Sequence, residues 1–592
     1  MKNKHDKLFS LFLISIVIVF FTIRPLNSPW FRIITADGLG YYSYLPAKFI
    51  YNDKNLEFKW FDEVYNKYYK YNSFATPTEN FTSKYKNKTI NKYYAAVSFL
   101  QMPFFFGTHA LVKIFGLHAD GFSQPYQMGI GFAGVFYACL GLWFLRLLLL
   151  KLFQNEWIAL IVPIVIFYGT SVYNYTIYIG SFSHIYSFCF IILSLYFAYC
   201  CFNEEENRTR NLLLFLLCSL IVILVRPFNI LFLLAVPAFM KMPLNLKLNF
   251  KEFKWQHYGI ILLGIIAVAY QFSILYAQTG TFFPYTYTGE RFYFNKPPHL
   301  FGILFSYKAG LFVYVPLTFI CFLSLFFVKS RKQFLFLIGA LALVILLYSY
   351  WWYWIILNRT IVDFTGILAI LLAFFLVNLT GKMRSASLIM IFLCVGYYQV
   401  KAFQLRNIIL DEHYTSKEYF WKNFFTLHQV NIFPVPPETI IEQIDDESCL
   451  PGDDPFLHNG NKTTLVSETK AFTKACHYKV PDIFTKEGFK KIKTSFWIYM
   501  EKDPESVQVV FKFHNSSNPE LAYIPFYIQG EKIRIGQWEY KEFGCSLPDN
   551  VTVNDSVYIF LWSDRYKGRF YIDKMKNQFF LCNDSYEMKM EQ

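Results

Sequence analysis

Long apolar segments alternate with short polar segments from residue 8 to about residue 402. A helix needs ~20 apolar residues to cross the hydrocarbon core of a bilayer, and most of these segments approach that length. Residues 403–592 contain no comparable segment. The pattern predicts a polytopic α-helical membrane protein with eleven transmembrane helices, at residues 8–23, 126–148, 157–178, 183–202, 211–225, 229–240, 257–277, 310–328, 334–354, 360–378 and 385–402.

The apolar segment at residues 94–117 is ambiguous because it contains Gln101, Pro103, His109 and Lys113. If it lies along the outer interface, the inner loops and the N-terminus carry sixteen Lys or Arg, and the short outer loops after residue 126 carry five. If it crosses, every later loop changes side and the positive-inside rule is broken. We therefore predict an interfacial helix here, a cytoplasmic N-terminus and an extracytoplasmic C-terminal domain.

These predictions divide the chain into a transmembrane domain at residues 1–402, a linker at 403–429 and an outer domain at 430–592. Residues 24–125 form the first outer loop with its interfacial helices. Three lysines precede the first apolar segment and no small-x-small cleavage site follows it, which favours an uncleaved signal anchor over a cleaved signal peptide. The formal charge of +14 resides mostly in the short loops, so nucleic acid is not an expected partner.

The outer domain shows short alternating segments separated by turn residues, which predict an antiparallel β sandwich. Its strands are expected at residues 495–500, 507–513, 521–529, 557–562 and 568–574. Residues 569–575 resemble the last strand of jelly-roll carbohydrate-binding modules. The domain would then hold an acceptor glycan, or else act as a folded cap without a ligand. Three tryptophans fit a core or a sugar platform equally well: Trp497, Trp538 and Trp562.

Four of the eleven cysteines lie in the outer domain. An even number suits disulfide bonds in an oxidising compartment, although spacing alone leaves the pairing open. These are Cys449, Cys476, Cys545 and Cys582. The other seven lie in or beside apolar segments and are expected to be packing residues. No Cys or His spacing typical of a structural zinc site occurs.

Ionisable residues gather on the predicted outer side, whereas the middles of the spans are almost without charge. A charge at mid-bilayer costs ~2.5–3.5 kcal/mol, which pumps and transporters accept in order to build a pathway. This chain avoids that cost and shows no internal repeat, so its chemistry is expected at one face. The gathered residues are Asp37, Lys92, His184, Arg226, Glu290, Arg291, Lys308, Arg359 and Asp363.

Asp37 is the candidate general base, because a carboxylate can take the proton of an acceptor hydroxyl as its oxygen attacks a sugar carbon. The alternative is a helix N-cap, since an aromatic segment beginning with Tyr41 and Tyr42 follows it. We expect both tyrosines to contact substrate.

Four cations are candidates for binding a donor phosphate: Lys92, Arg226, Arg359 and Lys308. Each also has a structural interpretation. Lys92 could anchor an interfacial helix, Arg226 could cap carbonyl groups beside Pro227, and Arg359 could form an i,i+4 ion pair with Asp363.

His184 and Asp363 are further candidate substrate contacts, with Glu290 and Arg291. His184 is equally compatible with a structural interfacial histidine. Glu290, Arg291 and Lys308 lie in a long outer loop rich in Tyr and Phe. Such a loop suits sugar or lipid contact, and equally an interfacial aromatic belt.

Several short motifs, and the order in which they follow one another along the chain, resemble those of the GT-C superfamily of membrane glycosyltransferases. The resemblance covers residues 1–402 and is strongest to the branch that holds protein O-mannosyltransferases and lipid A aminoarabinose transferases, including uncharacterised members from Bacteroidetes bacteria. Its carriers are Ala36-Asp37-Gly38-Leu39-Gly40-Tyr41-Tyr42, Asn91-Lys92-Tyr93, Asp120-Gly121-Phe122-Ser123-Gln124-Pro125-Tyr126-Gln127, Ser183-His184-Ile185-Tyr186-Ser187-Phe188, Val225-Arg226-Pro227, Lys308-Ala309-Gly310-Leu311-Phe312 and Asn358-Arg359-Thr360-Ile361-Val362-Asp363-Phe364.

The resemblance implies a sugar donor on a polyprenyl phosphate, an extracytoplasmic protein, lipid or glycan acceptor, and a multi-pass location in a bacterial inner membrane. It implies Asp37 as catalytic base and Lys92 as a contact of the donor phosphate. The chain departs from the pattern at Tyr93-Tyr94, where relatives have Pro-Pro, and at His184, where they often have a second acid. We therefore assign no metal and no further cofactor.

We expect a glycosyltransferase that acts with inversion. Three alternatives stay open: a transporter or flippase of lipid-linked sugars, a non-catalytic scaffold that displays the outer domain, and a ligase or polymerase of O-antigen using a diphosphate-linked donor. The sequence names neither the sugar nor the acceptor.

Overall fold

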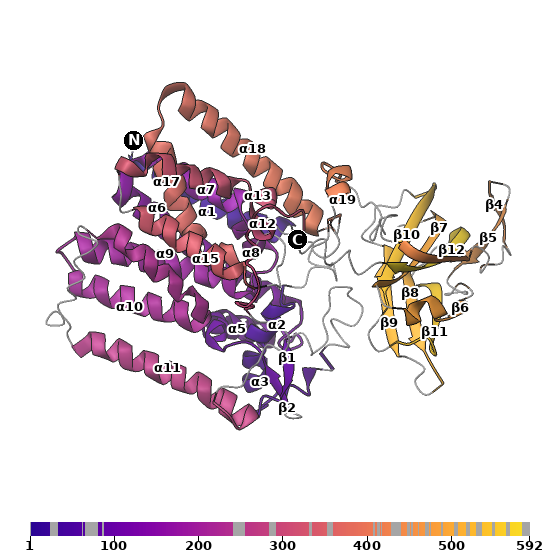
Figure 1. The fold of residues 1–592 in the computed structure, drawn as a ribbon. Helices are drawn as coiled ribbons and strands as arrows, with labels where there is room; N and C mark the ends of the chain where they lie inside the picture. The colour runs from indigo at the N-terminus through magenta and orange to yellow at the C-terminus, as the bar shows by residue number, and fades with distance from the viewer. Residues whose placement is uncertain are drawn as a thin grey trace. The chain divides into compact units, whose positions relative to one another are not determined.

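The computed structural model describes residues 2–582 apart from a set of gaps. The undescribed positions within this span are 24–32, 62, 65–80, 86–87, 241–254, 283–291, 309, 331–333, 352–358, 407–408, 411–414, 416, 428–439, 447–449, 451–453, 460, 468–472, 474, 487–488, 502–506, 517–520, 529–534, 548–550 and 564–568. The chain divides into two compact units, Met1–Gln399 and Val400–Gln592, which are described separately (Figure 1).

The first unit is helical, and six of its described helices are long and apolar enough to cross a membrane. The last of them continues into the second unit. They are α1 (Lys2–Ile23), α6 (Gln124–Phe153), α9 (Ser183–Asn203), α10 (Arg208–Val225), α11 (Trp255–Thr279) and α18 (Gly381–Arg406). The coarse prediction of a helical membrane region is thereby confirmed, whereas the count of eleven spans stays a prediction.

Shorter apolar helices occupy the other predicted spans. They are α7 (Glu156–Gly169), the 3₁₀ helix η2 (Pro227–Phe239), α14 (Leu317–Phe322) with η4 (Leu323–Ser330), α15 (Leu335–Tyr348) and α17 (Thr365–Asn378). Local sequence sets several of their ends. The Asn155 side chain accepts a hydrogen bond from the Ile158 N–H at the start of α7 (3.1 Å). Pro227 cannot continue α10 and opens η2 instead.

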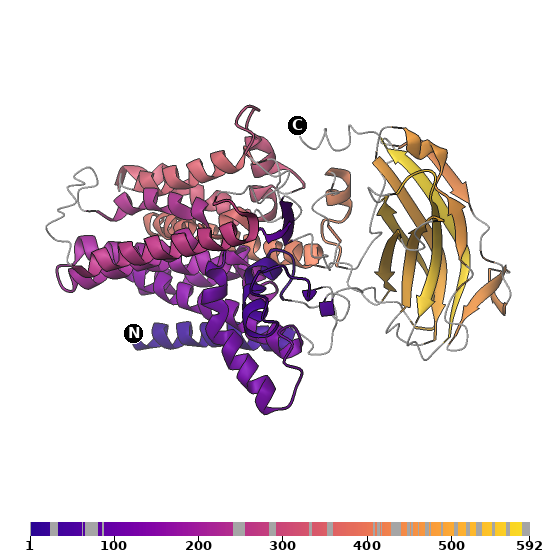
Figure 2. The same cartoon turned by 90° about the horizontal axis from the view of Figure 1, so that it is seen from below.

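Helix α5 and a set of short elements gather at one end of the long helices (Figure 1). They are α2 (Asp37–Tyr42), α3 (Tyr44–Phe49), β1 (Thr82–Tyr85), β2 (Lys88–Asn91), α5 (Ala96–Ile114), α8 (Val172–Ile177), α12 (Leu300–Phe305), α13 (Leu311–Tyr314) and α16 (Arg359–Val362). Helix α5 covers the ambiguous apolar segment, and it runs across the direction of α1 (Figure 2). It is absent from the helices that meet the length and hydropathy required for a span. The interfacial position of this helix stays a prediction.

Ion pairs join several helices at the opposite end of this unit. There Arg146 of α6 pairs with Asp6 of α1 and with Glu156 of α7, at 2.8 Å in each case. Lys151 pairs with Glu204, just past the end of α9. The N-terminus and the first of the predicted inner loops therefore lie at one end of this unit.

The second unit contains α19 (Lys417–Lys422) and two antiparallel sheets. The larger sheet has the order β10-β7-β12-β5-β4, with β3 also paired to β12, and the smaller has the order β6-β11-β8-β9. The strands are β3 (Ile440–Asp446), β4 (Asp454–His458), β5 (Asn461–Val466), β6 (Cys476–Lys479), β7 (Phe489–Met500), β8 (Val507–His514), β9 (Ala522–Tyr527), β10 (Trp538–Ser546), β11 (Ser556–Ser563) and β12 (Phe570–Cys582).

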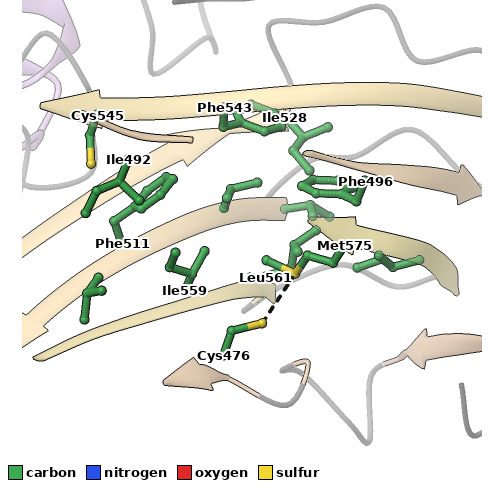
Figure 3. Packing of buried hydrophobic residues seen from close by; sticks show 14 of the residues in the cluster. Cys476, Ile492, Phe496, Phe511, Ile528, Phe543, Cys545, Ile559, Leu561 and Met575 are labelled. Carbon is green, nitrogen blue, oxygen red and sulfur yellow. Dashed lines mark hydrogen bonds between the residues drawn. The ribbon is translucent and has the colours of Figure 1, made fainter. Parts of the chain in front are cut away.

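Alternating side chains of both sheets form the core of this unit. Ile492 and Phe496 of β7 and Phe511 of β8 are almost fully buried, and Figure 3 shows them between the sheets. The predicted antiparallel sheet domain is confirmed in this coarse form. Of the three tryptophans, Trp497 and Trp538 contact the imidazole ring of His458 on the other face of the larger sheet.

The cysteines of the second unit differ in state. Cys476 is disulfide-bonded, and its sulfur lies 3.8 Å from the sulfur of Met575 (Figure 3). Cys545 is a buried free thiol, which does not fit the expectation that all four cysteines form disulfides. It faces the apolar core, where burial raises its thiol pKa and keeps it inert. Cys449 lies outside the described residues.

Candidate functional site

Four segments that are distant in sequence meet at the end of the first unit that also carries α2 and α5. Helices α9 and α10 pack against each other and run in opposite directions, so the start of α9 lies beside the end of α10. His184 is the second residue of α9, and Arg226 directly follows α10. Arg359 begins α16, Asp363 directly follows it, and Asp37 begins α2. We call this group of five residues the outer cluster.

Asp37 is bound by two side chains in this cluster. Its Oδ1 accepts a hydrogen bond from the Tyr93 hydroxyl at 2.8 Å, and its Oδ2 lies 3.0 Å from Nη1 of Arg359. The Asp37 and Arg359 side chains are 21% and 22% exposed, so both reach solvent. Asp37 makes no capping bond to α2. The N-cap interpretation is therefore wrong, and the carboxylate is oriented by tertiary contacts.

The segment around Asp37 explains why the motif needs small residues. Ala36 has φ 44° and ψ −125°, a conformation that glycine adopts more easily, and it places Asp37 at the start of α2. A Cβ on Gly40 would lie 2.1 Å from Cδ2 of Tyr93, so glycine allows the Tyr93 ring to reach the carboxylate. Gly38 likewise makes room for the side chain of Ser181.

Asn91 holds this arrangement from the neighbouring strand. Its side-chain amide donates to the Gly40 carbonyl at 2.8 Å, and its side-chain oxygen accepts from the Tyr93 N–H at 3.0 Å. Gln127 of α6 accepts from the N–H groups of Ile33 and Ile34, both at 2.9 Å, just before Asp37. The motif residues on either side of the cluster thus position α2.

Asp363 forms the buried half of the cluster. Its Oδ1 lies 2.6 Å from Nδ1 of His184, and its Oδ2 accepts from the Asn229 amide at 2.7 Å and from Arg226 Nη1 at 3.4 Å. Asp363 is fully buried and His184 is 2% exposed, whereas the Arg226 side chain is 22% exposed. Arg226 is therefore the end of this network that reaches solvent.

The distances decide the tautomer of His184. Nδ1 lies close to both Asp363 and Arg226 Nη1, the latter at 2.9 Å. A carboxylate oxygen at 2.6 Å requires a proton on Nδ1, because two acceptors would repel at that distance. We therefore assign Nδ1–H as the donor to Asp363, which leaves the guanidinium of Arg226 to interact with the carboxylate rather than with the imidazole.

The expected i,i+4 ion pair between Arg359 and Asp363 is not formed. Arg359 pairs with Asp37, and Asp363 pairs with His184 and Arg226. The reason is that α16 ends at Val362, one residue before Asp363, so the two side chains do not share a helix face. In place of one local pair, the structure has three acid–base pairs, and each joins segments that are distant in the sequence.

The two halves lie within electrostatic range of each other. Burial raises the pKa of Asp37, but the charge of Arg359, the hydrogen bond from Tyr93 and electrostatic interactions with His184 and Arg226 more than offset this, so the pKa lies below its ordinary value of 3.8. Burial also raises the pKa of Tyr41 to about 12. The ring centroids of Tyr41 and Tyr93 are 4.8 Å apart. The carboxylate is thus ionised at neutral pH, beside the neutral phenol of Tyr41.

Among the described residues, the carboxylates of the outer cluster are not bound by Lys92, Lys308 or Tyr42. Among the described residues, the direct side-chain partners of Asp37 are Tyr93 and Arg359, and Lys92 is not one of them, although it adjoins Tyr93 in the chain. Lys308 is half-buried in the turn between α12 and α13. The Tyr42 hydroxyl donates to the Gly121 carbonyl at 2.5 Å and its ring is fully buried, so its place is in the packed core.

Glu290 and Arg291 lie outside the described residues, so the structure places neither of them. The sequence reasoning missed two members of the site, Tyr93 and Asn229. Tyr93 belongs to the Asn91-Lys92-Tyr93 motif, and Asn229 follows Arg226 at a spacing of three residues on a turn that Pro227 begins. The motif and the spacing marked both positions in the sequence, but the neighbouring residues did not indicate which distant side chains they bind.

In the described part of the chain, no group of three His, Cys, Asp or Glu side chains is placed to hold a metal ion. The two carboxylates of the outer cluster are instead bound by Arg, His, Asn and Tyr donors. In comparisons with known proteins, no family model matches this chain and no curated protein matches it.

Proposed function

We propose that this protein is a membrane glycosyltransferase of GT-C type, which passes a sugar from a polyprenyl phosphate to an extracytoplasmic acceptor with inversion. One observation carries the proposal: a partly exposed carboxylate, Asp37, is held beside Arg359 and within range of Arg226 at one end of a set of apolar helices. A base and fixed cations in one place are what this reaction needs.

The proposed reaction requires one proton acceptor and one site for a departing phosphate. The acceptor oxygen attacks the anomeric carbon, and its proton passes to Asp37. The bond between that carbon and the phosphate oxygen breaks, and its electron pair leaves with the polyprenyl phosphate, whose charge changes from one negative to two. Attack from the side opposite the leaving group inverts the anomeric configuration. Because the leaving dianion needs no proton, a second acid is not required.

Arg226 and Arg359 are the cations that would stabilise the departing phosphate. Each of the two side chains is 22% exposed, and a guanidinium carries five N–H donors in a planar fork that matches phosphate oxygens. Asp363, His184 and Asn229 hold Arg226 in place. A preorganised cation costs little reorganisation when charge develops on the phosphate. Lys92 and Lys308 stay predicted contacts further along the donor.

The predicted topology places the outer cluster and the second unit outside the cytoplasm of a bacterial inner membrane. Two features support this proposal. The inner loops carry the excess of Lys and Arg. Cys476 of the second unit is disulfide-bonded, as expected in an oxidising compartment.

The test is mass analysis of cell-envelope glycans from a deletion strain complemented with wild type, Asp37→Asn or Asp120→Asn. Asp120 is the matched control, because its Oδ1 accepts the N–H groups of Phe122 and Ser123 and an asparagine keeps that oxygen. We expect wild type and Asp120→Asn to restore one glycan species, and Asp37→Asn at equal protein level to lose it.

If Asp37→Asn fully restores the glycan species, Asp37 is not the general base, and the non-catalytic scaffold is favoured. A glycan that accumulates unmodified on the inner side of the membrane would favour the flippase instead. Purified protein in detergent should release polyprenyl phosphate from a matched lipid-linked sugar only when the acceptor is present.

A further inference from the structure

We propose that Arg359 has two alternative partners, Asp37 before the donor binds and the donor phosphate afterwards, so that donor binding releases the catalytic base. This inference rests on the proposed function and adds to it an order of binding. It assigns to Arg359 the task of coupling the two substrates.

The two acid–arginine pairs of the outer cluster differ in a way that supports this division. Asp363 is fully buried and is also bound by His184 and Asn229, so its arginine, Arg226, is held on a fixed partner. Asp37 and Arg359 are both about one fifth exposed, at 21% and 22%. An incoming anion can therefore reach the second pair and compete for its guanidinium.

Exchange of partners is chemically straightforward at this position. Arg359 uses Nη1 for Asp37, and a guanidinium has further N–H donors in the same plane. A phosphate oxygen can bind those donors first and then displace the carboxylate. Asp37 would keep the hydrogen bond from the Tyr93 hydroxyl at 2.8 Å, which holds it in place after Arg359 leaves.

The exchange would make Asp37 a stronger base once the donor is bound. The charged or titratable groups that face it are Arg359 from α16, Tyr93 after β2, His184 from α9, Arg226 after α10 and Tyr41 from its own helix. The two arginines favour the ionised carboxylate. When a phosphate neutralises them, the proton affinity of the carboxylate rises, and it rises only in the complex that contains the donor.

A consequence is ordered binding. An acceptor that arrives first meets a carboxylate engaged by Arg359, whereas an acceptor that arrives second meets a released one. We expect initial-rate kinetics in which the donor adds before the acceptor, and competitive inhibition by polyprenyl phosphate against the donor.

The decisive experiment is a double-mutant cycle on binding of a polyprenyl monophosphate, the proposed product, to purified full-length protein in detergent micelles. The variants are Asp37→Asn, Arg359→Gln and the double variant. Asp37→Asn removes the competing carboxylate and should tighten monophosphate binding roughly fivefold to tenfold in the protein that keeps Arg359. In the Arg359→Gln background, the same change should tighten binding less than about twofold. Asp120→Asn should bind like wild type.

The outcomes separate the inference from the function on which it rests. If the wild-type protein does not bind the monophosphate, the proposed function and the inference both fail. If it binds, but Asp37→Asn gives the same gain in both backgrounds, the carboxylate only repels the phosphate and the exchange is refuted. If Arg359→Gln does not fold, Arg359→Lys replaces it in the cycle. Lysine keeps the positive charge but lacks the planar set of N–H donors, so Asp37→Asn should still tighten monophosphate binding, by a smaller factor.

Discussion

Replacement of Asp363 by asparagine should destabilise the first unit more than any conservative change at its surface. Asp363 is fully buried and faces three donors, from His184, Arg226 and Asn229. An asparagine offers one oxygen and one NH₂ group, and in either orientation the NH₂ group faces another donor. The positive charge of Arg226 also loses its counterion.

The magnitude follows from the burial of the pair. Removing one partner of a buried ion pair costs ~3–5 kcal/mol because the other charge stays behind. The Arg226 side chain keeps 22% exposure, so water compensates part of this and we expect about 3 kcal/mol, at the lower end of that range. Since the first unit spans residues 1–399, the unfolding entropy is large and this corresponds to a fall in Tm of about 4 °C.

Thermal unfolding of the purified protein in detergent, followed by tryptophan fluorescence, measures this change. Asp6→Asn is the matched control, because Asp6 is 53% exposed and its partner Arg146 also keeps Glu156. It should shift the free energy of unfolding by less than about 1 kcal/mol. Adding Arg226→Gln to Asp363→Asn should recover part of the loss, since no uncompensated charge remains. Equal Tm values for the Asp363 and Asp6 variants, or a double variant whose losses simply add, would refute the reasoning.

Three further predictions test other parts of the structure. Gly134→Ala should lower the free energy of unfolding by ~1–3 kcal/mol, because the new Cβ would lie 2.6 Å from the Gly180 Cα, and a backbone atom cannot move aside easily. Its control is Gly259→Ala, where the new Cβ meets open space, and this variant should be neutral or slightly stabilising in the same melting assay. The pKa of Asp37 is lower in the folded protein than in the unfolded chain, where it is ~3.9, so the ionised carboxylate stabilises the fold above that pH. This stabilisation is lost as the pH falls through the pKa of the folded protein. The Tm difference between wild type and Asp37→Asn should thus be constant above pH ~5 and shrink below pH ~4, and a difference that grows in acid would contradict it. Cys476 should resist alkylation in denatured protein until a reductant is added, as mass spectrometry of its peptide can show.

The sequence alone predicted the helices and the main strands because hydrophobic period and length are local properties. The described apolar helices lie at the predicted spans, and the five predicted strands correspond to β7, β8, β9, β11 and β12. The described strands that were not predicted are β1 and β2 of the first unit and β3, β4, β5, β6 and β10 of the second. Many of their residues are polar or charged, as in Lys541 and Glu542 of β10, so their alternation is weak. Pairing to a neighbouring strand, which is not a local property, defines them.

The sequence also determined which residues were candidates for the site, since charged residues at the predicted outer ends of the apolar helices are few. It could not determine their partners. The spacing of Arg359 and Asp363 predicted a pair between them, but the end of α16 at Val362 and the packing of α9 against α10 give each a different partner. Asp37 and Arg359 are more than three hundred positions apart, and only the folded chain brings them to 3.0 Å. Ion pairs depend on distance in space, and the tertiary packing of the helices sets that distance.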